Sequence, residues 1–431
     1  MVRYIGLDVH KQFIEICILD ESGKPIFRGK ASCRREELQK FVKANLKRTD
    51  RVALESTTNT WPVVEIIRPH VAQIVVGNPL KIKAIAEAKV KTDKVDAEVL
   101  AQLLRCDYLP AVWQPDDRTR EMRAWITHRC ALMTQRARLK NQIHGLLGRL
   151  LIHSPHKLLW TKKGVAWLKA VELPAHERVV VDSQLRQLAA VEQELAKLDE
   201  SLAALARSEP RVPLLMTLPG VNYVVAIGLL AALGDISRFV DGDHAAAYLG
   251  LAPSTRQSGD HCYHGHITKR GRSQTRWLLT QSAQHASRHP GPIGAFFRRL
   301  VRRKNRSVAI TAVARKLVTI AFLMLKNDEP YRYARPDLMR EKFSKLKLLP
   351  KRPAAKRGSP KPGLADIYRD VKLPRVRIPN QLPKGEERML DDRELRQFVL
   401  NLYLPPSARP ADKASATKSG RPAGRPKRSS F

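Results

Sequence analysis

The sequence predicts an α/β domain at the N-terminus, then long coiled-coil helices, a mainly α-helical second domain and a basic, largely disordered tail. Within the first 110 residues, short apolar segments alternate with segments of helical periodicity, which is typical of α/β domains. A leucine repeat follows in the middle of the chain, and Lys, Arg and Pro dominate after about residue 340. We place the domain limits at 1–115, 116–206, 207–330 and 331–431.

Strand and helix patterns alternate along the first domain. Tyr4–Val9 and Arg51–Glu55 are short apolar runs that each end in an acid, and Phe13–Leu19 is a further strand followed by a Ser-Gly-Lys turn. Apolar residues at helical spacing predict amphipathic helices. The other expected elements are strands at 25–30 and 71–76 and helices at 34–46 and 92–105.

Two long helices are expected after the first domain. Residues 117–150 have a basic helical pattern, whereas 151–182 have a mixed pattern that predicts no clear element. The apolar residues of 184–206 are spaced alternately three and four apart, as in a coiled-coil seam. They are Leu188, Val191, Leu195, Leu198, Leu202 and Leu205. This pattern is consistent with an antiparallel hairpin, a dimerisation arm or the core of a helical bundle.

The second domain contains apolar helix patterns at 224–233 and 273–287. The sequence LPGV at 218–221 is either a helix-hairpin-helix turn, which offers backbone N–H groups to a phosphate, or a plain turn between helices. Beyond it, residues 413–430 form a basic, low-complexity tail that we expect to be disordered and solvated.

The composition favours a nucleic-acid partner. The chain has 431 residues, a net charge of +37 and a hydrophobic fraction of 43%, which is enough for folded cores. So large a positive charge is typical of proteins that bind polyanions, of which nucleic acid is favoured over anionic membranes. No apolar run reaches the roughly 18 residues that span a bilayer, and no signal peptide pattern opens the chain. Five scattered cysteines show no disulfide framework, so we expect a bacterial cytoplasmic, nucleoid-associated protein without a membrane partner.

Four acids of the first domain have positions that suit a metal site. Asp8 and Glu55 each end a strand, and Asp93 and Asp96 lie three residues apart near the start of a helix, so that both project from one face. Such carboxylates are preferred ligands of Mg²⁺ or Mn²⁺, and two ions could clamp the reacting oxygens of a phosphodiester. Each acid taken singly is also an ordinary turn or helix-capping residue.

Three sequence blocks of the first domain resemble those of insertion-sequence-110-type transposases. The blocks are YIGLDVHK at 4–11, LEST at 54–57 and KTDKVDA at 91–97. These transposases carry an Asp-Glu-Asp-Asp motif on a RuvC-like fold of the ribonuclease H type. The resemblance, which extends over about residues 3–330, implies that Asp8, Glu55, Asp93 and Asp96 are catalytic and bind Mg²⁺ or Mn²⁺.

The second domain resembles the C-terminal domain of the same family. The matching blocks are YLGLAP at 248–253, RQSG at 256–259 and GHITKRG at 265–271. The resemblance implies that Ser258 is the nucleophile, assisted by the metal of the first domain, which requires the two domains to meet within a chain or across a dimer. Gly259 allows the backbone to bend and expose the hydroxyl, while Arg256, Lys269 and Arg270 could neutralise the scissile phosphate.

Three histidines near the serine do not form a zinc pattern. His261, His264 and His266 are joined only by Cys262, and their spacing differs from established zinc sites. Without the family resemblance, Ser258 would be interpreted as an ordinary loop serine in a glycine-rich turn.

The function predicted is that of a DNA transposase or site-specific recombinase that moves its own element. The resemblance implies a circular DNA intermediate, guidance by an element-encoded noncoding RNA, and a homodimer or homotetramer, because two duplexes are exchanged. One alternative is a metal-dependent junction resolvase or DNA invertase that uses activated water and forms no covalent serine intermediate. Another is a non-catalytic nucleic-acid-binding protein, against which the intact acids and the intact 257–259 block argue.

Overall fold

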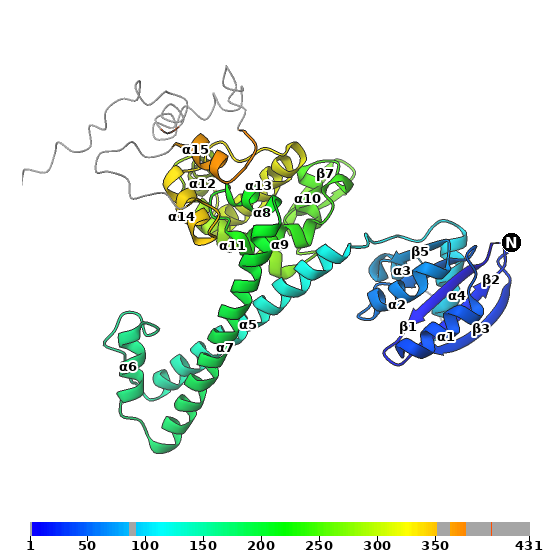
Figure 1. Ribbon diagram of the computed structural model, residues 1–431, viewed down its shortest axis with the longest axis horizontal. Coiled ribbons are helices and arrows are strands. Elements are labelled where there is room, and N and C mark those ends of the chain that lie inside the picture. The colour runs from blue at the N-terminus through cyan, green and yellow to red at the C-terminus, as the bar shows by residue number, and fades with distance from the viewer. Residues whose placement is uncertain (1, 86–91, 351–362, 376–397, 399–431) are drawn as a thin grey trace, which may run out of the picture. The chain divides into compact units, whose positions relative to one another are not determined.

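The computed structural model describes residues 2–85, 92–350, 363–375 and Phe398. The chain divides into two compact units, Met1–Pro115 and Asp116–Phe431, coloured from blue to red along the sequence in Figure 1. We describe each unit by itself. The expected tail at 413–430 lies outside the described residues.

A mixed five-stranded sheet forms the centre of the first unit. Its strand order is β3-β2-β1-β4-β5. β1, β2 and β3 pair antiparallel, whereas β4 and β5 run parallel to β1. The strands are β1 Tyr4–Val9, β2 Phe13–Leu19, β3 Pro25–Ser32, β4 Arg51–Glu55 and β5 Gln73–Gly77. All five expected strands are therefore present, and the last begins two residues later than expected, after a 3₁₀ turn at Arg68–His70.

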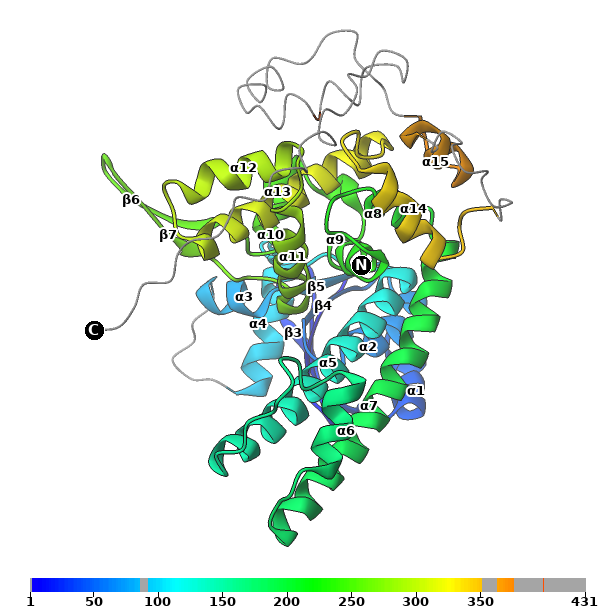
Figure 2. The same ribbon diagram turned by 90° about the vertical axis from the view of Figure 1, so that its left-hand side faces the viewer.

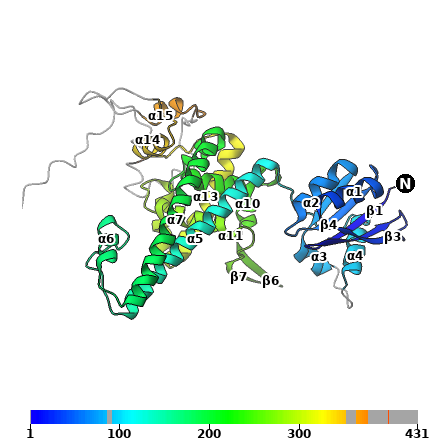
Figure 3. The same cartoon turned by 60° about the horizontal axis from the view of Figure 1, so that its bottom comes forward.

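Helices cover both faces of this sheet (Figure 3). On one face, α1 (Arg35–Asn45) and α2 (Thr60–Ile67) pack on a core that contains Ile5, Leu7 and Val9. On the other face lie α3 (Pro79–Ile85) and α4 (Asp93–Arg105). α2 and α3 were not among the expected elements, because both are short and α2 contains no amphipathic stripe: most of its residues are buried. The α/β prediction for this part of the chain is confirmed.

The second unit begins with a helical arm. It consists of α5 (Asp117–Arg149), α6 (Lys162–Ala170) and α7 (Ala175–Ser208). Ion pairs join α5 and α7 in opposite order along the two helices, so the helices are antiparallel, as Figure 1 shows. The pairs are Arg129–Asp199 at 2.6 Å, Lys140–Glu192 at 3.1 Å and Arg149–Glu177 at 3.5 Å. Of the alternatives, the antiparallel hairpin is therefore present within one chain. Leu188, Val191 and Leu195 of the seam pack in the arm, whereas Leu198, Leu202 and Leu205 join the helical core of the unit.

The end of the arm has a small core of its own. α6 lies in the segment for which the sequence predicted no element (Figure 2). Leu168 of this helix is fully buried. It packs in a cluster with Ile143 of α5 and Val181 of α7. Ile143, Leu146 and Leu147 of α5 complete this cluster with Leu159, Leu168 and Val181, so the segment 151–182 buries its apolar residues only together with α5.

A helical core completes the second unit. Its central helix α9 is apolar on all sides and buried from Val224 to Leu233, which is typical of a core helix. Around it lie α8, α10, α11, α12, α13 and a two-stranded hairpin. Their bounds are α8 Arg211–Met216, α9 Tyr223–Leu233, α10 Gly242–Tyr248, β6 Pro253–Ser258, β7 His261–Ile267, α11 Ser273–Ala286, α12 Pro292–Val301 and α13 Arg306–Asn327. The prediction named no hairpin, because the β6 residues are all exposed and show no apolar alternation.

The basic extension, which was expected to be largely disordered, contains two helices. α14 (Pro336–Lys345) and α15 (Leu364–Asp370) are folded and continue the helical core. Phe343 of α14, Tyr368 of α15 and Tyr331, which precedes α14, are all buried. These aromatic residues stabilise the extension despite the basic composition that suggested disorder.

One helix of the described residues, α13, is long and apolar enough to span a membrane by length and composition alone. Arg315 and Lys316 interrupt its apolar run, which is why the sequence pattern predicted no span. Val313, Leu317 and Ala321 of this helix are fully buried in the core of the second unit. We therefore describe α13 as a core helix.

Candidate active site

The carboxyl ends of β1 and β4 bring two acids to the same face of the sheet. β1 and β4 are parallel neighbours with Leu7 opposite Leu54. Both leucines face the core beneath α1 and α2. Because side chains alternate along a strand, the next residues, Asp8 and Glu55, belong to the opposite face, on which α4 packs.

Gly6 allows α4 to approach β1 closely. A Cβ atom at Gly6 would lie 1.8 Å from the Ala97 carbonyl oxygen, which no real contact permits. Ala97 and Ala101 of α4 are fully buried, so small residues line both sides of this contact. The absence of side-chain bulk therefore sets the distance between the strand that carries Asp8 and the helix that carries Asp93 and Asp96.

α4 begins at the acid pair. The Thr92 side chain accepts a hydrogen bond from the Val95 backbone N–H, so Thr92 is the N-cap and Asp93 and Asp96 lie in the first turn. Acids in the first turn interact favourably with the helix dipole. The structural role that the sequence allowed for Asp93 is therefore real, and it is compatible with a role in metal binding.

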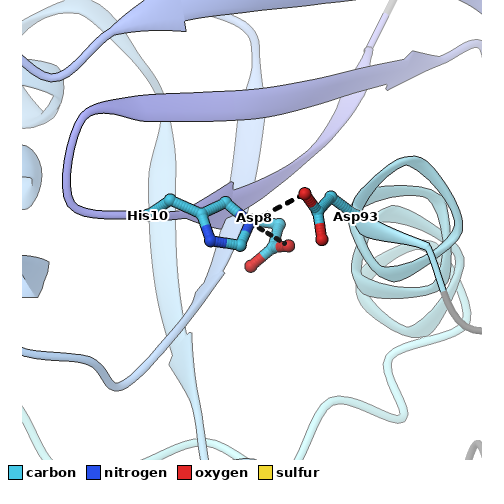
Figure 4. Close-up of side chains that lie close together, drawn as sticks. All are labelled: Asp8, His10 and Asp93. Carbon is cyan, nitrogen blue, oxygen red and sulfur yellow. Dashed lines mark hydrogen bonds and ion pairs between the residues drawn. The ribbon is translucent and has the colours of Figure 1, made fainter.

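His10 connects the strand acid to the helix acid (Figure 4). Its Nε2 lies 2.9 Å from Asp8 Oδ2 and 3.4 Å from Asp93 Oδ2. The ring stacks on Phe13 with 4.7 Å between the centroids, which holds its orientation. One potential ligand atom from each of Asp8, His10 and Asp93 lies within 4.8 Å of the others.

The acids at this edge destabilise one another's charged forms. Burial raises the pKa of the Asp8 carboxyl, and the negative charges of Asp96 and Asp93 raise it further, whereas His10 lowers it. The Asp8 side chain is 17% exposed and that of Asp93 is 48% exposed, so Asp8 bears most of the desolvation. A positive charge at this point would relieve both the burial cost and the repulsion.

The structure thus groups part of the predicted acid set directly. Asp8 and Asp93 are bridged by His10, and Asp96 is close enough to raise the pKa of Asp8. Glu55 follows Leu54 at the end of the neighbouring strand. Sequence reasoning missed His10, although it stands only two residues after Asp8, just beyond the end of β1.

The donor set suits a divalent cation. Carboxylate oxygens are the preferred ligands of Mg²⁺, while an imidazole beside carboxylates also suits Mn²⁺ and other transition metals. Asp8, Asp93 and His10 offer both kinds of donor. The residues present therefore fit a metal ion. Such an ion would supply the positive charge that offsets the burial and repulsion by which the pKa of Asp8 is raised.

Ser258 lies at the exposed end of the β6–β7 hairpin. It is the last residue of β6 and pairs in register with His261. Gly259 follows with φ +56°, a left-handed conformation that favours glycine in this tight turn. The hydroxyl is thus presented on an exposed hairpin, in contrast to the packed environment of Asp8.

Basic residues stand on and beside this hairpin. Arg256 is exposed on β6, and Lys269 and Arg270 are exposed just after β7. Arg276 of α11 donates hydrogen bonds to the carbonyls of Arg270 and Gly271, which anchors the turn that carries them.

Two families match the chain. Residues 5–152 match a transposase family of the DEDD type named for IS110. Residues 212–298 match the family described as transposase IS116/IS110/IS902. The first match contains the acids of the sheet edge, and the second contains the hairpin with Ser258.

Several curated proteins are similar over most of their length. The transposase for insertion sequence element IS1111A of Coxiella burnetii is 25% identical over 77% of this chain and 92% of its own. The IS116 protein of Streptomyces clavuligerus is 23% identical over 77% of this chain and 97% of its own. The pilin gene-inverting protein of Moraxella bovis is 27% identical over 76% of this chain and 97% of its own. With both family matches in the expected order, the chain belongs to the IS110 family of transposases, enzymes that act on DNA.

Proposed function

We propose that this transposase cleaves and rejoins DNA strands with a carboxylate metal site and a serine nucleophile, guided by an RNA of its own element. The observation that carries the proposal is the grouping of Asp8, Asp93 and His10 at the carboxyl end of β1. The strand order β3-β2-β1-β4-β5, with only β2 reversed relative to its neighbours β1 and β3, supports a RuvC-like fold of the ribonuclease H type.

The four acids would hold the metal. In this proposal Asp8, Glu55, Asp93 and Asp96 bind Mg²⁺ or Mn²⁺, and His10 either joins them or orients Asp8. When bound, the ion would supply positive charge to the scissile phosphodiester and its reacting oxygens. The protein's own contribution is to hold the carboxylates in place through the packing of α4 on β1.

Ser258 would exchange one phosphoester bond for another. Its Oγ forms a bond to phosphorus, one bond from phosphorus to a deoxyribose oxygen breaks, and the serine proton goes to the departing oxygen. Rejoining reverses these changes with a different DNA end. Arg256, Lys269 and Arg270 would offset the phosphate charge during both steps. Their exposure on and beside the hairpin leaves them accessible to DNA.

The partners of the proposal follow from charge and from the reaction. The net charge of +37 suits simultaneous contact with DNA and with a structured RNA. Because two duplexes must be cut and exchanged, a homodimer or homotetramer is expected, in the bacterial cytoplasm where the DNA is. Base pairing by the RNA would read the sequence, while the protein reads shape and phosphates.

A second candidate is a DNA invertase or junction resolvase in which activated water cleaves the strand. The similarity to the Moraxella bovis protein, which is named as pilin gene-inverting, favours inversion as an outcome. Inversion and transposition could share the serine chemistry. Only the water mechanism predicts cleavage without a covalent protein–DNA intermediate.

The deciding experiment is a search for a covalent protein–DNA adduct. The full chain, purified with its bound RNA, is mixed with labelled DNA of the element junction and Mg²⁺, then analysed on a denaturing gel. We expect an adduct with the wild type, none with Ser258→Ala, and an undiminished adduct with Ser254→Ala. Ser254 is a matched control, because it lies on the same strand and its hydroxyl donates to the His266 carbonyl. Cleaved DNA with no adduct in any lane would overturn the serine step in favour of water.

A further inference from the structure

The second unit contains a cavity whose lining includes neither the acids of the sheet edge nor Ser258. It has a volume of about 210 Å³ and lies beside the LPGV turn between α8 and α9. The end of α11 and the beginning of α14 form its other walls. Of the described residues that line it, none is acidic and five are basic, namely His285, Arg288, His289, Arg335 and Lys342.

His289 has a buried donor that needs an acceptor. The residue is 5% exposed, and burial lowers its pKa to about 4, so the ring is neutral near pH 7. Its Nδ1 accepts a hydrogen bond from the Gly291 backbone N–H at 3.0 Å. A neutral ring whose Nδ1 accepts must carry its proton on Nε2. Nε2 is buried without a hydrogen-bond partner in the described structure, and an unmet buried donor is costly.

The ammonium group of Lys342 is a second hydrogen-bond donor at the cavity, and it is held against the LPGV turn. Its Nζ donates to the Met216 carbonyl at 2.7 Å and to the Leu218 carbonyl at 2.9 Å. Capping the end of α8 in this way is a structural role, but it uses two of the three ammonium protons. Burial lowers the pKa of Lys342 to about 7. None of the described residues that line the cavity is an acid that could neutralise its charged form.

The two remaining cations differ in how they are held. Arg335 is paired with Asp337, which lowers the net charge near the cavity. Arg288 is exposed at the end of α11 and lines the cavity. Arg288 is therefore the residue that can be changed with the least effect on folding, whereas His289 supplies the most specific donor.

We propose that this cavity binds a backbone phosphate of a nucleic-acid strand. The non-bridging oxygens accept from His289 Nε2 and from the remaining Lys342 proton, and Arg288 adds charge at the opening. The volume suffices for a phosphate group, because one water takes up only about 30 Å³ in the liquid. The site lies outside the acid and serine motifs, and it would make the LPGV turn part of a phosphate clamp.

The test is a double-mutant cycle on nucleic-acid affinity. His289→Asn keeps an acceptor for the Gly291 N–H, as in an Asx turn, but removes the Nε2 donor. Binding of a short labelled DNA duplex and of a labelled RNA of equal length is measured by fluorescence anisotropy at several salt concentrations. Lys197→Gln is the control, because Lys197 lies on the arm and pairs with Glu194.

Each variant has its own expected signature. His289→Asn should weaken binding about tenfold, as for one hydrogen bond to a charged group, with an unchanged salt slope. Arg288→Gln should weaken binding and reduce the slope of log K against log salt by about 0.9, as for one phosphate contact. The double variant should lose less than the product of the two effects, because both residues hold the same phosphate. When Lys197→Gln is combined with His289→Asn, the two fold-changes in affinity should multiply, because the two residues do not share a phosphate.

The results with the DNA and RNA probes show which nucleic acid, if either, occupies the cavity. Coupling with the DNA probe assigns the phosphate to DNA, and coupling with the RNA probe alone assigns it to RNA. Unchanged affinity of His289→Asn, or multiplicative effects with both probes, would mean that only water fills the cavity and would overturn the proposal. If His289→Asn lowers the melting temperature, the test rests on Arg288→Gln alone. In that case inorganic phosphate should displace DNA from the wild type better than chloride does at equal ionic strength. This difference between the two anions must vanish in Arg288→Gln.

Discussion

The acid edge of the first unit and the serine hairpin of the second are held in very different ways. Asp8 stands on a central strand, 17% exposed, beneath a helix whose backbone touches Gly6. Ser258 stands on a two-stranded hairpin whose β6 residues are all exposed. Packing therefore determines the geometry of the acids, while the hairpin is free to adapt to a substrate. Substitutions in the two regions should accordingly separate activity from stability in different ways.

The largest expected effect is that of Asp8→Asn on activity. Loss of this partly buried carboxylate removes a proposed metal ligand, so strand cleavage should fall by at least about 10³-fold, comparable to other losses of charge stabilisation. Stability should be kept or slightly increased, because burial and two neighbouring acids already disfavour the charged form of Asp8. Cleavage assays and thermal melts with and without Mg²⁺ measure both quantities.

Binding distinguishes this result from simple misfolding. Asp8→Asn should retain wild-type affinity for DNA and RNA, and Asp117→Asn, at an exposed acid of α5, should retain full cleavage. Loss of nucleic-acid binding together with a lowered melting temperature would show that Asp8 is needed for folding. The acid edge and the serine hairpin would then no longer differ in how activity and stability respond to substitution.

Two glycines test the same contrast through the backbone. Gly6→Ala places a Cβ against the Ala97 carbonyl, so the free energy of unfolding should fall by about 1–3 kcal/mol, as for other overpacked sites. Gly259→Ala meets nothing within 4 Å and should cost only about 1 kcal/mol, through its positive φ. The two costs are measured by denaturant unfolding, in which equal values would show that α4 can move away from β1.

Gly145→Ala calibrates these values. This glycine lies within α5, and a Cβ there meets nothing within 4 Å. Because alanine is the better helix former, the free energy of unfolding should rise by about 0.5–1 kcal/mol. A loss of stability here would indicate a partner surface on α5 that the single chain does not reveal.

The extent to which the sequence predicts the fold and the site depends on how strongly each region is packed. The five strands and the long helices were predictable, because apolar periodicity marks buried faces, as the leucine seam of α7 shows. The β6–β7 hairpin and the folded extension were not, since an exposed hairpin has no apolar alternation and Tyr331 and Tyr368 are isolated aromatics in a basic sequence. Asp8, Glu55, Asp93 and Asp96 were identified from their positions at strand ends and a helix start together with the motif resemblance, whereas His10 emerged only from three-dimensional proximity.

His10 gives the smallest expected effect and the finest distinction at the acid edge. His10→Gln removes an interaction that lowers the pKa of Asp8, so this pKa should rise and the acidic limb of the cleavage–pH profile should move to higher pH. Metal affinity should fall by about tenfold, the lower end of the range for residues that orient ligands. If His10 only orients Asp8, Mg²⁺ and Mn²⁺ should weaken equally in titrations of the apo protein. A selective loss of Mn²⁺ would make the imidazole a direct ligand, because nitrogen donors favour Mn²⁺ over Mg²⁺.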